Sequence, residues 1–210
     1  MTNGTSRTGP KPRFAEQDAV NVALELGLTN FTLGAVADRL GVRTSALYRI
    51  IASRDHLVEL CVKHVATNWP FKQTATTWQT NITIGVNALW EIMDTYEGLD
   101  QTMLTSATSS IAFQKHHQEF KNRLNGTGFP GDDATADLLI EFVFGSVIAS
   151  HCQVAAVRAA HKLHNGSDPD QHWLARGYVD EKVAFFINAI EQGLSVLPFN
   201  GSDMEPENDI

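Results

Sequence analysis

Apolar residues recur every three or four positions along most of this chain, and no stretch alternates with the period of two that strands show. This spacing predicts helices throughout, with Gly, Pro and Asn marking where they end. We expect long helices over residues 14–26, 53–68, 76–96, 110–124, 132–164 and 180–196, and shorter ones over 32–40, 43–51 and 100–108. Residues 1–12, rich in Gly, Thr, Ser and Pro, and the acidic segment 200–210 are predicted to be disordered. The predicted fold class is therefore all-α.

The stretch from Phe31 to Leu60 predicts two short helices joined by a tight turn, followed by the start of a third helix. Thr32 is placed to cap the first helix, and Gly41 suits a turn that needs a positive φ. Ser53 is placed to cap the third helix, with Asp55 in its first turn, where the helix dipole favours a negative charge. Such a helix-turn-helix places its second helix in the major groove of DNA.

At these positions the chain resembles the TetR family of transcriptional regulators. The resemblance extends back to Phe14 and is carried by Thr32, Gly41-Val42, Leu47-Tyr48, Ile50-Ile51 and Ser53-Arg54-Asp55. The family usually has His or Tyr followed by Phe where this chain has Ile50-Ile51, so the packing role is kept and a polar contact is lost. The resemblance implies a three-helix, N-terminal DNA-binding head, residues 13–60, and a helical ligand-binding and dimerisation body, residues 61–199.

Side-chain chemistry selects the candidate DNA contacts within the head. Arg43 can donate two hydrogen bonds to the O6 and N7 atoms of guanine, and Tyr48 resembles the tyrosine with which the family binds phosphate. The full candidate set is Thr32, Arg43, Thr44, Ser45, Tyr48, Arg49 and Arg54. The alternative is that the arginines form only a solvated face.

The charge of the chain is divided unequally between head and body. The net charge is −8, but residues 1–63 carry eight Lys or Arg and six Asp or Glu, whereas residues 64–210 carry eight and eighteen. A mildly basic head on an acidic body fits a protein whose head alone faces DNA phosphates.

The predicted helices over 132–164 and 180–196 are apolar on more than one face, which exceeds what one subunit needs to bury. Two such helices can pair with their copies into a four-helix interface around a two-fold axis, as the resembled family also implies. The candidate interface residues are Phe144, Val147, Phe185, Phe186, Ala189 and Ile190. The alternative is a central pair of core helices in a monomer.

The resemblance also implies a small-molecule pocket inside the body. Candidate lining residues are Trp69, Trp90, Met93, Met103, Phe113, His116, Phe142, His151 and Cys152. Each can equally be ordinary core. An interior rich in aromatic residues and Met suits a hydrophobic or aromatic effector. His151, in the middle of an apolar helix, needs a polar partner.

Other classes of protein find little support in the sequence. The eight histidines do not adopt a compact metal-ligand spacing, and neither a Ser-His-Asp order nor a glycine-rich phosphate loop is present, so we expect no metal, no cofactor and no enzymatic activity. The two cysteines, the polar N-terminus and the lack of a run of about 20 apolar residues favour a cytoplasmic protein without a membrane partner.

These features together predict a homodimeric repressor that leaves a palindromic DNA operator when a small effector binds. Two alternatives remain open from the sequence. One is a constitutive or activating DNA-binding protein without an effector. The other is a small-molecule-binding helical protein with a vestigial head.

Overall fold

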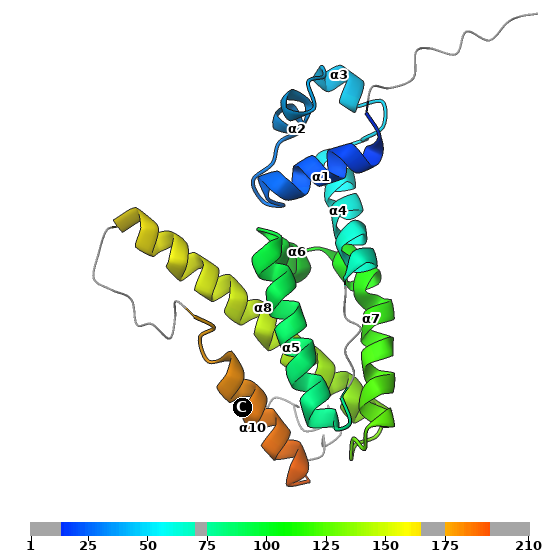
Figure 1. Ribbon diagram of the computed structural model, residues 1–210, viewed down its shortest axis with the longest axis vertical. Coiled ribbons are helices and arrows are strands. Elements are labelled where there is room, and N and C mark those ends of the chain that lie inside the picture. The colour runs from blue at the N-terminus through cyan, green and yellow to red at the C-terminus, as the bar shows by residue number, and fades with distance from the viewer. Residues whose placement is uncertain (1–13, 70–74, 165–174, 194–210) are drawn as a thin grey trace, which may run out of the picture.

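The computed structural model describes residues 14–69, 75–164 and 175–193 (Figure 1), and all regular structure in these ranges is helical, as predicted. The helices are α1 (Glu16–Leu26), α2 (Leu33–Arg39), α3 (Thr44–Leu47), α4 (Arg54–Asn68), α5 (Trp78–Thr95), α6 (Leu99–Thr105), α7 (Ala107–Gly126), α8 (Asp133–His164) and α10 (Val179–Glu191). The predicted disordered ends lie outside the described residues. The last helix ends at Glu191, with Gln192 as its C-cap, and not at residue 196 as predicted, because Gly193 takes a positive φ of +79°.

The predicted caps of α2 and α4 are confirmed, whereas the boundary expected near residue 109 lies at Ser106, between α6 and α7. The Thr32 hydroxyl accepts the Ala35 N–H at 3.1 Å, and the Ser53 hydroxyl accepts the His56 N–H at 3.0 Å. Gly41 turns the chain between α2 and α3 with φ +67°.

The helix predicted over 43–51 is shorter than expected. It closes after Leu47, and residues 48–50 continue as turns, in which the Arg49 N–H bonds to the Ala46 carbonyl at 3.3 Å. The sequence does not distinguish the two, because a helix and a run of turns offer the same apolar spacing over so few residues.

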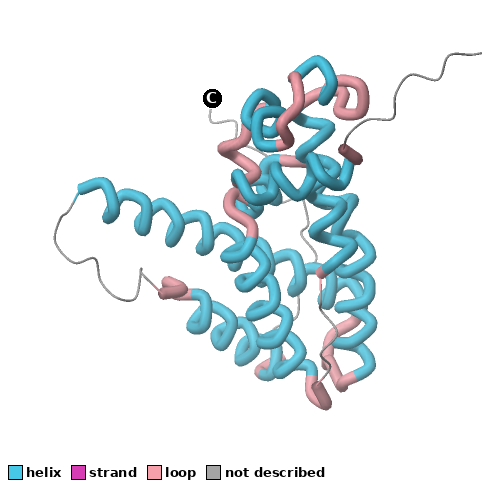
Figure 2. Tube along the Cα trace, turned by 45° about the horizontal axis from the view of Figure 1, so that its top comes forward, coloured by secondary structure: helices cyan, strands magenta, loops and turns pink. Residues whose placement is uncertain are grey.

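The head lies at one end of the molecule and the body extends from it along α4 (Figure 1). α1 and α4 pack together in the head, and the lower part of α4 packs on α7. α8 is the centre of the body, in contact with α5, α6, α7 and α10. Figure 2 shows the C-terminal part of α8 extending past its neighbours.

A continuous apolar core runs through the head and into the body. Leu47, Ile51 and Leu57 are fully buried in the head. Ile51 therefore keeps the packing role at the position where the chain departs from the family pattern, and Ile50 packs against the same core while partly exposed.

By length and composition α8 could cross a membrane: within Asp133–His161, a window of 18 residues has a mean hydropathy of 1.6. Asp137, Glu141 and Arg158 interrupt this helix, so it is not the continuous run of about 20 apolar residues that the sequence lacks. The packing of α8 explains its composition instead, because it contacts four helices and its Val143, Val147 and Val154 are buried. A central helix of a bundle needs apolar residues on several faces.

Candidate functional site

The candidate DNA-binding residues of α3 and the following turn lie on the surface of the head. Arg43, Ser45 and Arg49 are exposed, Thr44 is half-buried, and the Tyr48 side chain is 55% exposed. Local packing explains this display, because Leu47 and Ile51 turn inward and so direct Tyr48 and Arg49 outward. An aromatic ring at such exposure is available to a partner.

Thr32 has a role inside the head as well as a position on its surface. Its hydroxyl oxygen accepts the Ala35 N–H, which caps α2. The residue remains exposed, so its hydroxyl proton and the free N–H groups of the first turn of α2 are available to a phosphate oxygen.

The structure gives Arg54 an internal role, and its predicted phosphate contact stays a prediction. Its guanidinium donates to the carbonyl of Leu28 at 2.8 Å, of Phe31 at 3.2 Å and of Thr29 at 3.4 Å. The group also lies over the Phe31 ring, 4.7 Å from the centroid. Arg54 therefore fastens the start of α4 to the loop between α1 and α2. The sequence gives no sign of this, because the three carbonyls belong to a loop more than twenty residues away.

The head and the body meet where this loop contacts the turn between α5 and α6. The Leu28 N–H donates to the Glu97 carbonyl at 2.8 Å, and the Asn30 amide donates to the Glu97 carboxylate at 2.8 Å. Gly98 follows with φ +80°, and a Cβ at this position would lie 2.7 Å from Thr29 Oγ1. The close approach of head and body therefore requires glycine here.

Several of the predicted effector-binding residues lie in two separate groups, in which their rings pack against one another. Trp69, Phe113 and His116 form one, with ring centroids 5.1–5.9 Å apart, and the His116 ring contacts the Ala66 carbonyl through Nε2 at 2.6 Å. Trp90 lies in the other, between His151 at 4.8 Å and the Arg176 guanidinium at 5.2 Å.

The remaining apolar candidates, Met93, Met103 and Phe142, do not lie together in one pocket. Met93 is fully buried in the core, and Met103 packs partly buried against it. Phe142 lies on the outside of α8, 51% exposed, and contacts Phe186 across a centroid distance of 4.3 Å. It therefore belongs to the outer face of the body and not to an interior pocket.

His151 has the polar partner that its position demands. Its Nδ1 lies 2.8 Å from the buried Asp100 carboxylate, and its Nε2 lies 3.3 Å from the Asp94 carboxylate. Arg158 extends the network by donating to Asp94 at 3.1 Å. Both ring nitrogens of His151 therefore face a carboxylate oxygen. The network ties α8 to α5 and to the start of α6.

Opposing effects set the ionisation of Asp100 and Cys152. Burial raises the pKa of Asp100, but hydrogen bonds from His151, from the Gln101 N–H and from the Cys152 thiol outweigh it, so the pKa lies below its ordinary value. Burial, followed by the nearby Asp100 charge, raises the pKa of Cys152 to about 12. Burial alone raises the pKa of Cys61 to about 12. Both thiols are therefore protonated at neutral pH, which disfavours redox sensing.

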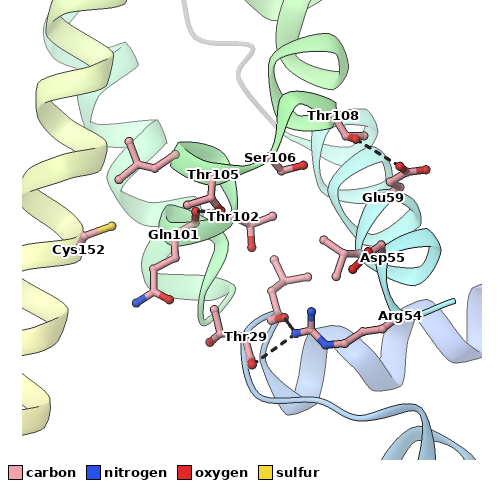
Figure 3. Close-up of a pocket in the computed structure, with 13 residues that line it drawn as sticks. Thr29, Arg54, Asp55, Glu59, Gln101, Thr102, Thr105, Ser106, Thr108 and Cys152 are labelled. Carbon is pink, nitrogen blue, oxygen red and sulfur yellow. Dashed lines mark hydrogen bonds between the residues drawn. The ribbon is translucent and has the colours of Figure 1, made fainter.

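A cavity of about 660 Å³ opens where head and body meet (Figure 3). One wall is α4 with the α1–α2 loop, the other is α6 with the start of α7, and Cys152 of α8 lies at the edge. Its lining residues are Leu28, Thr29, Arg54, Asp55, Val58, Glu59, Gln101, Thr102, Leu104, Thr105, Ser106, Thr108 and Cys152. Of the nine residues that the sequence suggested for an effector site, only Cys152 lines this cavity. The sequence does show that Asp55 and Glu59 lie one helical turn apart on the same helix. It does not show which residues form the opposing wall, because these are brought near only by the fold.

The outer face of α8 and α10 carries exposed apolar side chains. Leu138 is 46% exposed and Phe185 66% exposed, and Phe142 joins them. Of the predicted interface residues, Phe186, Ala189 and Ile190 are partly buried beside this face. The other two point inward: Phe144 packs on Phe120 at 5.0 Å, and Val147 is buried between α8 and α10. Periodicity identified the helices correctly but not which of their several apolar faces is internal.

The histidines and acids of the described residues form no cluster of three that could hold a metal ion. His117 instead pairs with Asp137 at 2.9 Å, and Lys121 contacts the same carboxylate at 3.0 Å.

No protein-family model and no curated protein sequence matches the chain. Among solved structures, it is similar to a TetR transcriptional regulator from Streptomyces coelicolor, with a TM-score of 0.54 and 18% sequence identity, over 86% of this chain and 97% of that one. At this identity the likeness shows the fold, which is that of a TetR regulator. The fold implied by the sequence resemblance is thereby confirmed.

Proposed function

We propose that this protein is a homodimeric transcriptional repressor that binds a palindromic DNA operator and leaves it when a small molecule binds. The observation that carries the proposal is the exposed surface of α3 on a fold of the TetR type. There Arg43, Ser45, Tyr48 and Arg49 present guanidinium and hydroxyl groups to solvent. These groups suit base edges and phosphate oxygens.

The outer face of the body supports the dimer. Leu138, Phe142 and Phe185 are exposed on adjacent helices, and large apolar side chains at such exposure favour a protein partner. A second copy related by a two-fold axis would cover this face in both subunits, and would set two heads side by side for two half-sites. Regulation rather than catalysis is the activity that this arrangement serves.

Release by an effector is supported by the joint between head and body. The head contacts the body through Glu97 and Gly98, which directly precede α6, and α6 is tied to α8 by the His151–Asp100 pair. A ligand that displaces α6 would therefore move the head. Coupling of this kind is worth about 1–3 kcal/mol, and it requires the ligand to bind the DNA-free arrangement more tightly.

Selection of binding sites from random DNA at moderate salt tests the DNA-binding function, since phosphate contacts make affinity salt-dependent. We expect an enriched palindrome. Arg43→Ala and Tyr48→Phe should each weaken binding to it by about tenfold, the usual value of one good contact. Lys115→Ala is the matched control, because Lys115 is an exposed cation on the body, far along the chain from the head.

Failure to enrich any sequence, or equal affinity of all three variants, would favour the vestigial-head alternative. A palindrome whose binding no small molecule alters would favour a constitutive regulator instead.

A further inference from the structure

We propose that the cavity between head and body is a binding site for a linear aliphatic polyamine. The cavity combines two carboxylates and several hydroxyl oxygens with a patch of aliphatic side chains, so it suits a ligand of ammonium groups joined by methylenes. This inference rests on the proposed function only for its consequence, a change in DNA binding. The site itself is argued from the cavity lining.

Two hydroxyl groups of the α6 wall can act only as hydrogen-bond acceptors towards the cavity. Thr102 Oγ1 donates its proton to the Gly98 carbonyl, and Thr105 Oγ1 donates to the Gln101 carbonyl, each at 2.8 Å. Their protons are used within the helix, so each hydroxyl offers its remaining lone pair to the cavity. These two positions therefore favour a ligand that donates hydrogen bonds, such as an ammonium group.

Two carboxylates on the α4 wall add negative charge. Asp55 and Glu59 are exposed, one turn apart, and both line the cavity (Figure 3). Neither takes part in an ion pair among the described residues, and Glu59 accepts only a 3.4 Å hydrogen bond from Thr108. Arg54 also lines the cavity and keeps its positive charge, but its guanidinium is directed to the carbonyls of the α1–α2 loop and forms no ion pair with either carboxylate.

The spacing and the aliphatic lining narrow the ligand class. Residues four apart on a helix have Cβ atoms about 5–6 Å apart, a distance that ammonium groups separated by about four methylenes can match. Leu28, Val58 and Leu104 lie in the same lining and can cover those methylenes. A volume of 660 Å³ falls within the usual range for small-molecule sites and leaves room for such a chain.

A ligand in this cavity would contact the head directly. The ligand would bridge α4, which carries the head, and α6, which belongs to the body. It would also lie beside Leu28, whose N–H bonds to the Glu97 carbonyl across the joint. No relay through the interior of the body is needed.

Calorimetric titration of the full chain with spermidine, without DNA, tests the site. We expect saturable binding that Asp55→Asn and Glu59→Gln each weaken by about fivefold and the double variant by more. Glu25→Gln with Asp38→Asn removes two exposed acids of the head that do not line the cavity, and should leave binding within about twofold. Mg²⁺ at equal ionic strength measures unspecific attraction to an acidic protein.

Spermidine binding that is no tighter than that of Mg²⁺, or that survives the double substitution, would overturn the site. If the double variant fails to fold, the two single variants carry the same test. A second experiment measures operator affinity with and without saturating spermidine. We expect spermidine to change the affinity of the wild type by about fivefold or more and to leave that of the double variant unchanged. Direct binding of spermidine to DNA affects both proteins equally. Loss of operator binding without any polyamine would count against the proposed function alone.

Discussion

Arg43 and Arg54 have different roles in the head, although they lie only eleven residues apart. Arg43 is exposed at the start of α3, whereas Arg54 bonds to three loop carbonyls and lies over Phe31. We expect Arg54→Gln to lower the free energy of unfolding by about 1–3 kcal/mol, because partly buried carbonyls lose a charged donor. Arg43→Gln should change stability by less than about 0.5 kcal/mol. Thermal unfolding of both variants checks this. If the two variants are equally stable, Arg54 does not have the structural role proposed.

Gly98 is the residue on which the contact between head and body depends most. Its φ is +80°, and an added Cβ would meet both the side chain and the backbone nitrogen of Thr29. We expect Gly98→Ala to cost about 1–3 kcal/mol in stability, from backbone strain and from the clash. Gly126→Ala is the control, since a Cβ there meets nothing within 4 Å and φ is not positive. Comparable unfolding temperatures for the two variants would contradict the prediction.

The Asp100 carboxylate should make stability depend on pH. Hydrogen bonds from His151, from the Gln101 N–H and from Cys152 overcome the effect of burial and hold its pKa below the ordinary value. A carboxylate with a lowered folded pKa contributes stability above its unfolded pKa of about 3.9, and the contribution is lost as pH falls through the folded pKa. The stability difference between the wild type and Asp100→Asn should therefore be large at pH 6 and shrink at about pH 3 or below. Chemical denaturation at both values measures it, and a difference independent of pH would refute it.

At the scale of helices, the outer face of α8 and α10 makes the clearest prediction. Phe185 is 66% exposed there, and Ile111 of α7 is 73% exposed elsewhere. We expect Phe185→Glu to convert a dimer into a monomer, because a charge would be buried at the centre of the interface. Ile111→Glu should leave the dimer intact. Sedimentation velocity of the two variants distinguishes them, and a dimeric Phe185→Glu would place the interface on another surface.

The helices themselves were largely predictable from the sequence, because their signals are local. Thr32 and Ser53 cap α2 and α4 as their positions suggested, and Gly41 turns the chain between α2 and α3. A cap requires only residues three positions apart, which a sequence displays directly.

The contacts between helices were less predictable, because they depend on which faces meet. Phe144 and Phe142 lie two residues apart on α8. Phe144 was predicted at the dimer interface and Phe142 in the effector pocket, but Phe144 packs on Phe120 and Phe142 lies on the outside. The cavity shows the same limit. Asp55 and Glu59 were visible on one helix, but Thr102 and Thr105 of the opposing wall are brought to them only by the turn at Gly98.

For the molecule as a whole, the uneven charge constrains how it can meet DNA. The negative charge belongs to the body: residues 64–210 carry a net −10, whereas residues 1–63 carry a net +2. An acidic body repels phosphates, so only the ends of a dimer that carry the heads can approach a duplex. Electrostatic attraction and repulsion should therefore orient the protein on DNA before any side chain contacts a base.

This geometry predicts how salt should affect operator binding. The logarithm of the affinity falls linearly with the logarithm of salt concentration, with a slope of about −0.9 per phosphate neutralised. A dimer that engages both half-sites should show about twice the slope of a variant that engages one. We therefore expect wild-type protein on a full palindrome to lose affinity with salt about twice as steeply as Phe185→Glu on a single half-site. Fluorescence anisotropy between 50 and 200 mM salt, the range over which such slopes are usually compared, measures both. Equal slopes would mean that one head alone contacts DNA, and that the exposed face of α8 and α10 serves a partner other than a second reading subunit.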